Sequence, residues 1–222
     1  PREVPMASKL SKISFVLFVF IMVLFPHISL AFNNETRCQI LKDAISFSPK
    51  YLRSYLTVNF TAVHEGIHFA DRNKEAAASI RNQDTKKLYN RIVRDLSQGK
   101  GNDFHTPHRF GLLACFIAET IYSDRFIART SLIPKKVIYD GYHEVSNIDT
   151  SLSRLVVKYK KPYGHSRDKR VTDYLYNVAV NEIVDHWISA WQAGGEKPGL
   201  LTRRGSKISH ENTVIYNLKP RG

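Results

Sequence analysis

The stretch "PHRFGLLACFIAETIY", residues 107–122, decides the fold, because its apolar residues cover most faces of a helix. A helix of that kind is buried on nearly all sides, so we expect it at the centre of the protein. Other segments carry an apolar stripe at helical spacing, and we find neither an internal repeat nor the alternation typical of strands. These flanking helical segments are 38–47, 50–60, 84–98 and 168–191. We therefore expect an all-α fold, a single multi-helix domain.

The chain has 222 residues and a formal net charge of +13. This length is enough to bury the core of one domain without metal or disulfide support. The charge suits an anionic partner: a phospholipid headgroup or another phosphodiester, an acidic surface or, less favoured, nucleic acid. A solvated basic surface without such a partner explains it equally well. Two cysteines, Cys38 and Cys115, do not define a disulfide framework.

The N-terminal residues have the pattern of a secretory signal. Lys9 and Lys12 precede the apolar run "ISFVLFVFIMVLF" (13–25), and small residues end the segment at Ala31. The run has about a dozen residues, whereas a membrane span needs about twenty, so an uncleaved anchor is the weaker alternative. We expect export to the periplasm or medium, with cleavage after Ala31. The expected divisions are 1–5 upstream of the first methionine, 6–31 signal peptide, 32–193 helical domain and 194–222 basic, flexible tail.

The string H-E-x-x-H occurs at residues 64–68. In zinc peptidases His64 and His68 would bind the metal and Glu65 would be the general base. That chemistry also needs a third protein ligand and a sheet edge for the substrate, and the sequence identifies neither. Gly66 inside the string weakens a helix by about 1 kcal/mol. A metallopeptidase is therefore the third of our hypotheses.

Four segments of the chain resemble the zinc-dependent phospholipase C family, which shares its fold with the fungal single-strand nucleases. The resemblance spans about residues 31–193, the part that follows the expected signal peptide. It implies an all-helical fold, with a zinc cluster in a cleft that polarises a phosphodiester and generates the attacking hydroxide. The segments are "AFNNETRCQILKDAISFSP" (31–49), "EGIHFAD" (65–71), "HRFGLLACFIAET" (108–120) and, in the fourth helix, "DGYHE" (140–144).

Asp71 matches the family aspartate that bridges two metals and helps to activate water, so the resemblance makes it the catalytic candidate. Cys115 and Glu119 occupy the places of a histidine and an aspartate one helical turn apart. Asp140 and Glu144 occupy the places of a histidine and a glutamate with the same spacing. With His64 and His68, these residues are the candidate metal ligands, for zinc or, given so many carboxylates, for a harder divalent ion.

Two arginines depart from the family pattern. Arg37, after Thr36, and Arg125 stand where the family has ligand histidines. A guanidinium cannot bind a cation, so an arginine in the cleft would pair with Asp71, Glu119 or Glu144 instead. The sequence thus predicts a phosphodiester hydrolase of phospholipase C type that is active or degenerate, or a non-catalytic binding or structural domain on the same fold.

Several residues capable of chemistry are expected to have ordinary structural roles. Cys115 lies in an apolar segment, where a free cysteine is usually a small buried hydrophobe. His105 and His108 are expected in a loop before the central helix, solvated or capping it. The aromatic side chains of the last helix are expected in the core, namely Tyr174, Tyr176, Trp187 and Trp191.

Overall fold

A computed structural model describes residues 34–69, 82–121, 133–163 and 168–210 of the chain. The predicted signal peptide, Asp71 and Arg125 lie outside these ranges. The elements are α2 (Asn34–Phe47), α3 (Lys50–Val58), α4 (Phe60–Ile67), α7 (Asn82–Ser97), α8 (His105–Ile121), β1 (Lys136–Ile138), α9 (Ile148–Leu155), the π-helix η1 (Val156–Lys160), α10 (Lys161–Tyr163), α11 (Lys169–Ala193) and β2 (Lys207–Ser209). The predicted mostly helical fold is confirmed.

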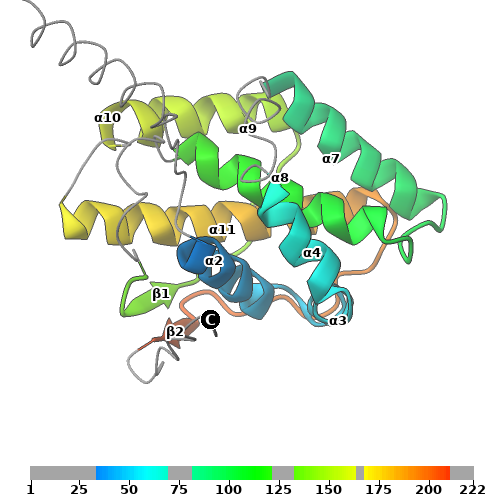
Figure 1. The fold of residues 1–222 in the computed structure, drawn as a ribbon, viewed down its shortest axis with the longest axis horizontal. Coiled ribbons are helices and arrows are strands. Elements are labelled where there is room, and N and C mark those ends of the chain that lie inside the picture. The colour runs from blue at the N-terminus through cyan, green and yellow to red at the C-terminus, as the bar shows by residue number, and fades with distance from the viewer. Residues whose placement is uncertain (1–33, 70–81, 122–132, 164–167, 211–222) are drawn as a thin grey trace, which may run out of the picture.

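Helix α8 runs through the middle of the molecule, as its sequence predicts. Helix α4 crosses in front of it, α7 and α9 lie along its upper side, and α11 runs below and behind it, with α2 packed on α11 (Figure 1). Its apolar residues, from Phe110 to Ile121, are buried on nearly every side. Helix α8 begins at His105, so His105 and His108 lie in its first turns and not in a preceding loop. None of the helices in the described ranges is long and apolar enough to span a bilayer.

The crossing of α4 over α8 depends on two glycines that face each other. A Cβ atom on Gly66 would lie closer than 3.0 Å to the backbone carbonyl of His108. A Cβ atom on Gly111 would lie equally close to the backbone of Val63. Contacts that short do not occur, so only glycine permits this approach of two backbones. The glycine that weakens H-E-x-x-H as a metal helix is therefore explained by packing.

A row of polar side chains on α11 holds an extended segment of backbone. The row consists of Asn177, Asn181, Asp185 and Ser189, four residues apart and so on one face of the helix. Their oxygens accept hydrogen bonds from the backbone N–H groups of Ile138, Asp140, His143 and Val145. This polar row explains why a largely buried helix carries so many polar residues, since buried polar groups require partners.

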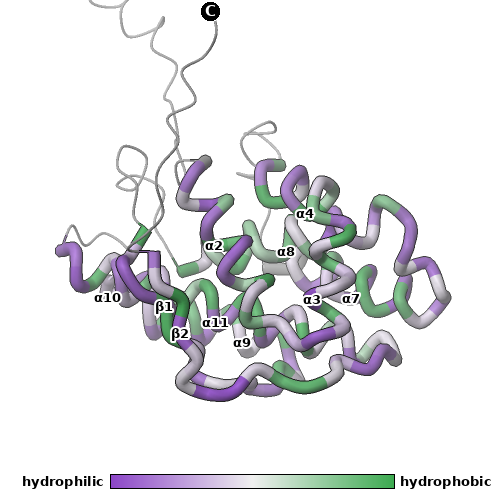
Figure 2. Tube along the Cα trace, turned by 90° about the horizontal axis from the view of Figure 1, so that it is seen from below, coloured by the Kyte–Doolittle hydropathy of each residue, from purple (hydrophilic) through white to green (hydrophobic). Residues whose placement is uncertain are grey.

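Part of the expected tail belongs to the folded domain. Residues 207–209 form β2, which pairs antiparallel with β1. His210 then contacts the buried carboxylate of Asp43 at 3.1 Å, and the Trp191 indole donates to the carbonyl of Lys197. Figure 2 shows hydrophilic residues recurring along this segment, which lies on the outside of the helices. The basic stretch up to residue 210 is thus anchored by specific contacts.

We expect Gly111→Ala to destabilise the protein by at least about 2 kcal/mol, because the added methyl group must push α4 off α8. Alanine normally stabilises a helix relative to glycine, so a loss of stability in Gly111→Ala would come from the α4–α8 crossing. The measurement is urea unfolding followed by circular dichroism. Gly101→Ala is the control, because its Cβ would meet only a flexible Leu96 side chain at 3.3 Å. Equal stability of the two variants would contradict the packing argument.

Candidate functional site

Arg37 lies in the place that the resemblance gives to a metal ligand, and it forms a buried ion pair. Only 2% of its side chain is exposed. One guanidinium nitrogen, Nη2, donates to Oε1 of Glu119 at 3.1 Å, and Nη1 donates to the carbonyl of Ile67 at 3.4 Å. Of the carboxylates considered as partners for Arg37, Glu119 is therefore confirmed. This arginine connects α2 to α8 and to the C-terminal end of α4.

Cys115 and Glu119 lie together, one turn apart on α8, as their spacing predicts. The Cys115 thiol donates to the same Glu119 oxygen, with a sulfur–oxygen distance of 3.6 Å. Cys115 is buried, and neither it nor Cys38 forms a disulfide. Because Arg37 and the thiol both donate to the Glu119 carboxylate, that carboxylate acts as an acceptor of hydrogen bonds. Cys115 and Glu119 are thus brought together as predicted, but the cation bound to Glu119 is the Arg37 guanidinium.

Asp140 and Glu144 are not on a helix, which corrects the expectation for "DGYHE". This segment is extended, and Gly141 has a φ of 99°, which favours glycine. The α11 polar row binds the backbone of the segment, so its N–H groups cannot form a helix. In an extended chain, residues four apart are separated by roughly 13 Å along the backbone, whereas on a helix they lie one turn apart. Asp140 and Glu144 therefore do not form the predicted one-turn pair.

His64 and His68 lie side by side on α4 and at its end, with ring centroids 4.5 Å apart. His64 also contacts the Phe60 ring at 5.7 Å. Within the described ranges, no group of three or more histidine, cysteine or acidic residues is placed to hold a metal. The sheet in those ranges has two strands of three residues each. The two histidines are thus close together, and the part of the chain that the structure describes adds no third ligand to them.

Acidic residues meet on α11 where the sequence gave no specific signal. Both carboxylate oxygens of Glu182 accept hydrogen bonds from Nη2 of Arg154, at 3.0 and 3.1 Å. Asp185 accepts from the His143 backbone at 3.0 Å, and its second oxygen lies 3.3 Å from the His143 ring. Burial raises the pKa of Asp185 to about 8, and it also raises the pKa of Glu182 and Asp140. This arrangement can hold a proton at neutral pH next to an exposed imidazole.

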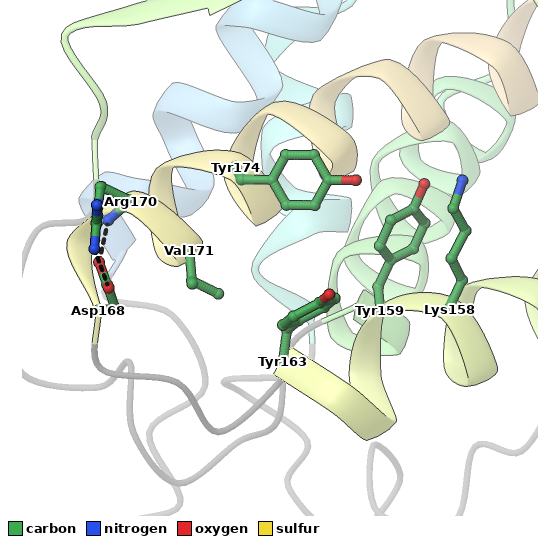
Figure 3. Close-up of a pocket in the computed structure, with 7 residues that line it drawn as sticks. All are labelled: Lys158, Tyr159, Tyr163, Asp168, Arg170, Val171 and Tyr174. Carbon is green, nitrogen blue, oxygen red and sulfur yellow. Dashed lines mark hydrogen bonds and ion pairs between the residues drawn. The ribbon is translucent and has the colours of Figure 1, made fainter.

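A pocket of about 550 Å³ lies where η1, α10 and the first turns of α11 meet (Figure 3). Tyr174 lines it and is 49% exposed, so the expectation that it belongs to the core is wrong. Tyr176, Trp187 and Trp191 are buried, as predicted. The described residues that line the pocket are Lys158, Tyr159, Tyr163, Asp168, Arg170, Val171 and Tyr174. The helical spacing of Tyr174 could not reveal this pocket, because two other elements form its walls.

We expect Arg37→Met to destabilise the fold by about 2–4 kcal/mol, because it leaves the Glu119 carboxylate partly buried without its guanidinium. The double variant Arg37→Met/Glu119→Leu should recover more than half of the loss. Denaturant unfolding of both single variants and the double variant gives the coupling energy, expected above about 1 kcal/mol. Lys169→Met, which removes an exposed pair with Asp173, is the control. Additive effects at residues 37 and 119 would contradict the ion pair.

We expect Asp185→Asn to gain stability relative to the parent as the pH rises. The folded carboxyl, with its pKa near 8, keeps a proton that the unfolded chain loses above about pH 4. Parent stability therefore falls between pH 4 and 8 by up to about 1.4 kcal/mol per pH unit, and asparagine removes this term while keeping an acceptor for His143. Thermal unfolding across this range measures the difference. A difference that does not change with pH would contradict the raised pKa.

Comparisons of the chain with protein-family models, with curated proteins and with solved structures give no match. The function must therefore be argued from the contacts of the residues themselves.

Proposed function

We propose that this chain is an exported, non-catalytic binding domain on a phospholipase C-like helical frame. In this proposal the buried ion pair of Arg37 and Glu119 replaces the metal centre and its chemistry. The observation that carries it is the 2% exposure of the Arg37 side chain together with its 3.1 Å contact to Glu119. In this proposal a permanent cation, the Arg37 guanidinium, stands where the resemblance implies a ligand histidine.

The chemistry of the guanidinium argues against a metal at this position. Arginine offers five N–H donors and no lone pair, and it stays protonated in proteins. Two like charges a few Å apart repel, and the repulsion grows as water is excluded. A divalent ion beside Glu119 would have to compete with Arg37 for the same carboxylate. The described residues at this position therefore do not fit the zinc cluster that the resemblance implies.

The remaining ligand candidates do not compensate for this change. Asp140 lies beside α11, near Glu182 and Asp185 of that helix, and its partner in the predicted pair, Glu144, is not one helical turn away. His64 and His68 contact each other on another helix. Clustered metals act on phosphodiesters because they bind the attacking and leaving oxygens together, which requires ligands that converge. In the described part of the chain no three of these candidates converge as metal ligands, and this supports the proposal of a binding domain.

Export and an anionic partner remain parts of the proposal. The N-terminal pattern of basic residues, apolar run and small residues supports export. The net charge of +13 supports a partner that carries phosphate or carboxylate groups, such as a phosphodiester headgroup. A binding role needs no metal and is consistent with the ion pair.

We expect the purified full chain, dialysed against Zn²⁺ or Mn²⁺ and then against metal-free buffer, to retain no stoichiometric metal. The reason is the Arg37 cation, and elemental analysis by mass spectrometry is the measurement. Hydrolysis of bis(4-nitrophenyl) phosphate should not exceed the protein-free rate. His68→Ala serves as the control, since it shows whether any trace zinc sits on the histidine pair. Stoichiometric metal that survives in His68→Ala, with hydrolysis that a chelator abolishes, would overturn the proposal.

A further inference from the structure

The pocket at the start of α11 has walls from three elements. Tyr174 and Val171 come from α11, Tyr163 from α10, and Tyr159 and Lys158 from η1 (Figure 3). Tyr163 and Tyr174 are 43% and 49% exposed, whereas Tyr159 is only 7% exposed and lies behind them. The Tyr159 and Tyr174 rings meet edge to face, with centroids 6.1 Å apart. Two aromatic surfaces thus remain open to a ligand and are supported by a third ring.

The backbone that forms one wall is unusual. Residues Val156–Lys160 form a π-helix between α9 and α10. Single π-helical turns are rare, carry poorer packing than an α-helix, and are found frequently at functional sites. Lys158 and Tyr159, which are adjacent in this π-helix, both line the pocket. A rare backbone geometry therefore positions two of the residues that a ligand would contact.

The charges around the pocket favour an anion. The Lys158 ammonium lies 5.0 Å from the centroid of the Tyr159 ring. At the other end Arg170 pairs with Asp168 at 3.2 Å, so those two charges offset each other. Lys158 also lies near Tyr174, and the hydrogen bond to Tyr159 raises its pKa, which keeps it cationic. A cationic ligand that approached the Tyr159 ring would be repelled by the Lys158 ammonium, whereas an anionic ligand would be attracted to it.

We propose that this pocket binds a small anion that carries a planar ring, with the ring against Tyr163 and Tyr174 and the anionic group at Lys158. The volume of about 550 Å³ suits a ligand of one or two rings, because small-molecule sites span roughly 300–1,000 Å³. Aromatic side chains bind planar rings by stacking or edge contacts, worth about 0.5–1.5 kcal/mol beyond the buried area. An aryl phosphate and an aromatic carboxylate share this chemistry.

This inference rests on the binding role proposed above and names the ligand class for it. It uses none of the residues around Arg37, so the two proposals fail in different experiments. If the chain holds no metal and the pocket binds nothing, only the ligand assignment falls. If ring anions bind only while a divalent metal is present, the metal-free binding role falls as well.

Isothermal titration calorimetry of the full chain with phenyl phosphate, benzoate, benzyl alcohol and inorganic phosphate tests the pocket. We expect the ring anions to bind at least about tenfold more tightly than the neutral ring or phosphate alone, and the affinity to fall as salt is added. The tighter of phenyl phosphate and benzoate identifies the anionic group. Treatment with a chelator should leave the affinity unchanged.

Variants locate the site. Tyr174→Ala and Lys158→Met should each weaken binding about tenfold or more, since each removes one of the two interactions. Tyr51→Ala on α3, a tyrosine of similar exposure outside the pocket, and Lys161→Met on α10 are the matched controls and should bind as the parent does. Tyr163→Ala is a second test of the ring wall if Tyr174→Ala unfolds. Equal affinity in the pocket variants and the controls, or no binding of either ring anion, would overturn the proposal.

Discussion

The close crossing of α4 over α8 at Gly66 and Gly111 is the constraint on which the rest of the structure depends. Because the two backbones touch, the last turn of α4 lies directly against α8. The Ile67 carbonyl, which has no partner within its helix, and the Glu119 carboxylate then both come within reach of Arg37. A side chain at either glycine would separate the helices and leave the guanidinium with fewer buried acceptors. The close packing of α4 on α8 and the buried ion pair of Arg37 therefore depend on the same two glycines.

The helices could be predicted because each must bury one face, and burial imposes an apolar period on the sequence. The segment 140–144 could not be predicted in the same way. Its conformation is set by Gly141 and by side chains of α11 some forty residues later in the chain. Likewise, nothing local in residues 194–210 shows that β2 pairs with β1 or that His210 contacts Asp43. Long-range partners override local pattern wherever the local signal is weak.

In the candidate site, too, one feature could be predicted from the sequence and another could not. That Arg37 needs a carboxylate follows from its residue type alone, since a buried guanidinium must be paired, and Glu119 was among the carboxylates considered. The pocket was not predicted, because Tyr174 has the spacing of a core residue on α11. Its exposure depends on the position of η1 and α10, and a π-helical turn leaves no periodic trace in the sequence. Residue chemistry predicted the pair; only three-dimensional placement could reveal the pocket.

Arg37 can satisfy the structural role of a metal without its catalytic role. Its guanidinium contacts residues of α4 and α8 from α2, as a bound ion would connect ligands from different helices. A metal in a catalytic site keeps a coordination position open for substrate, whereas a guanidinium paired with a carboxylate and a carbonyl has no such position to offer. A domain that gains stability in this way loses the means to activate water there. In the binding function that we propose, ligand recognition falls to surfaces elsewhere, and among the described residues the tyrosine-lined pocket combines open aromatic faces with a cation, Lys158.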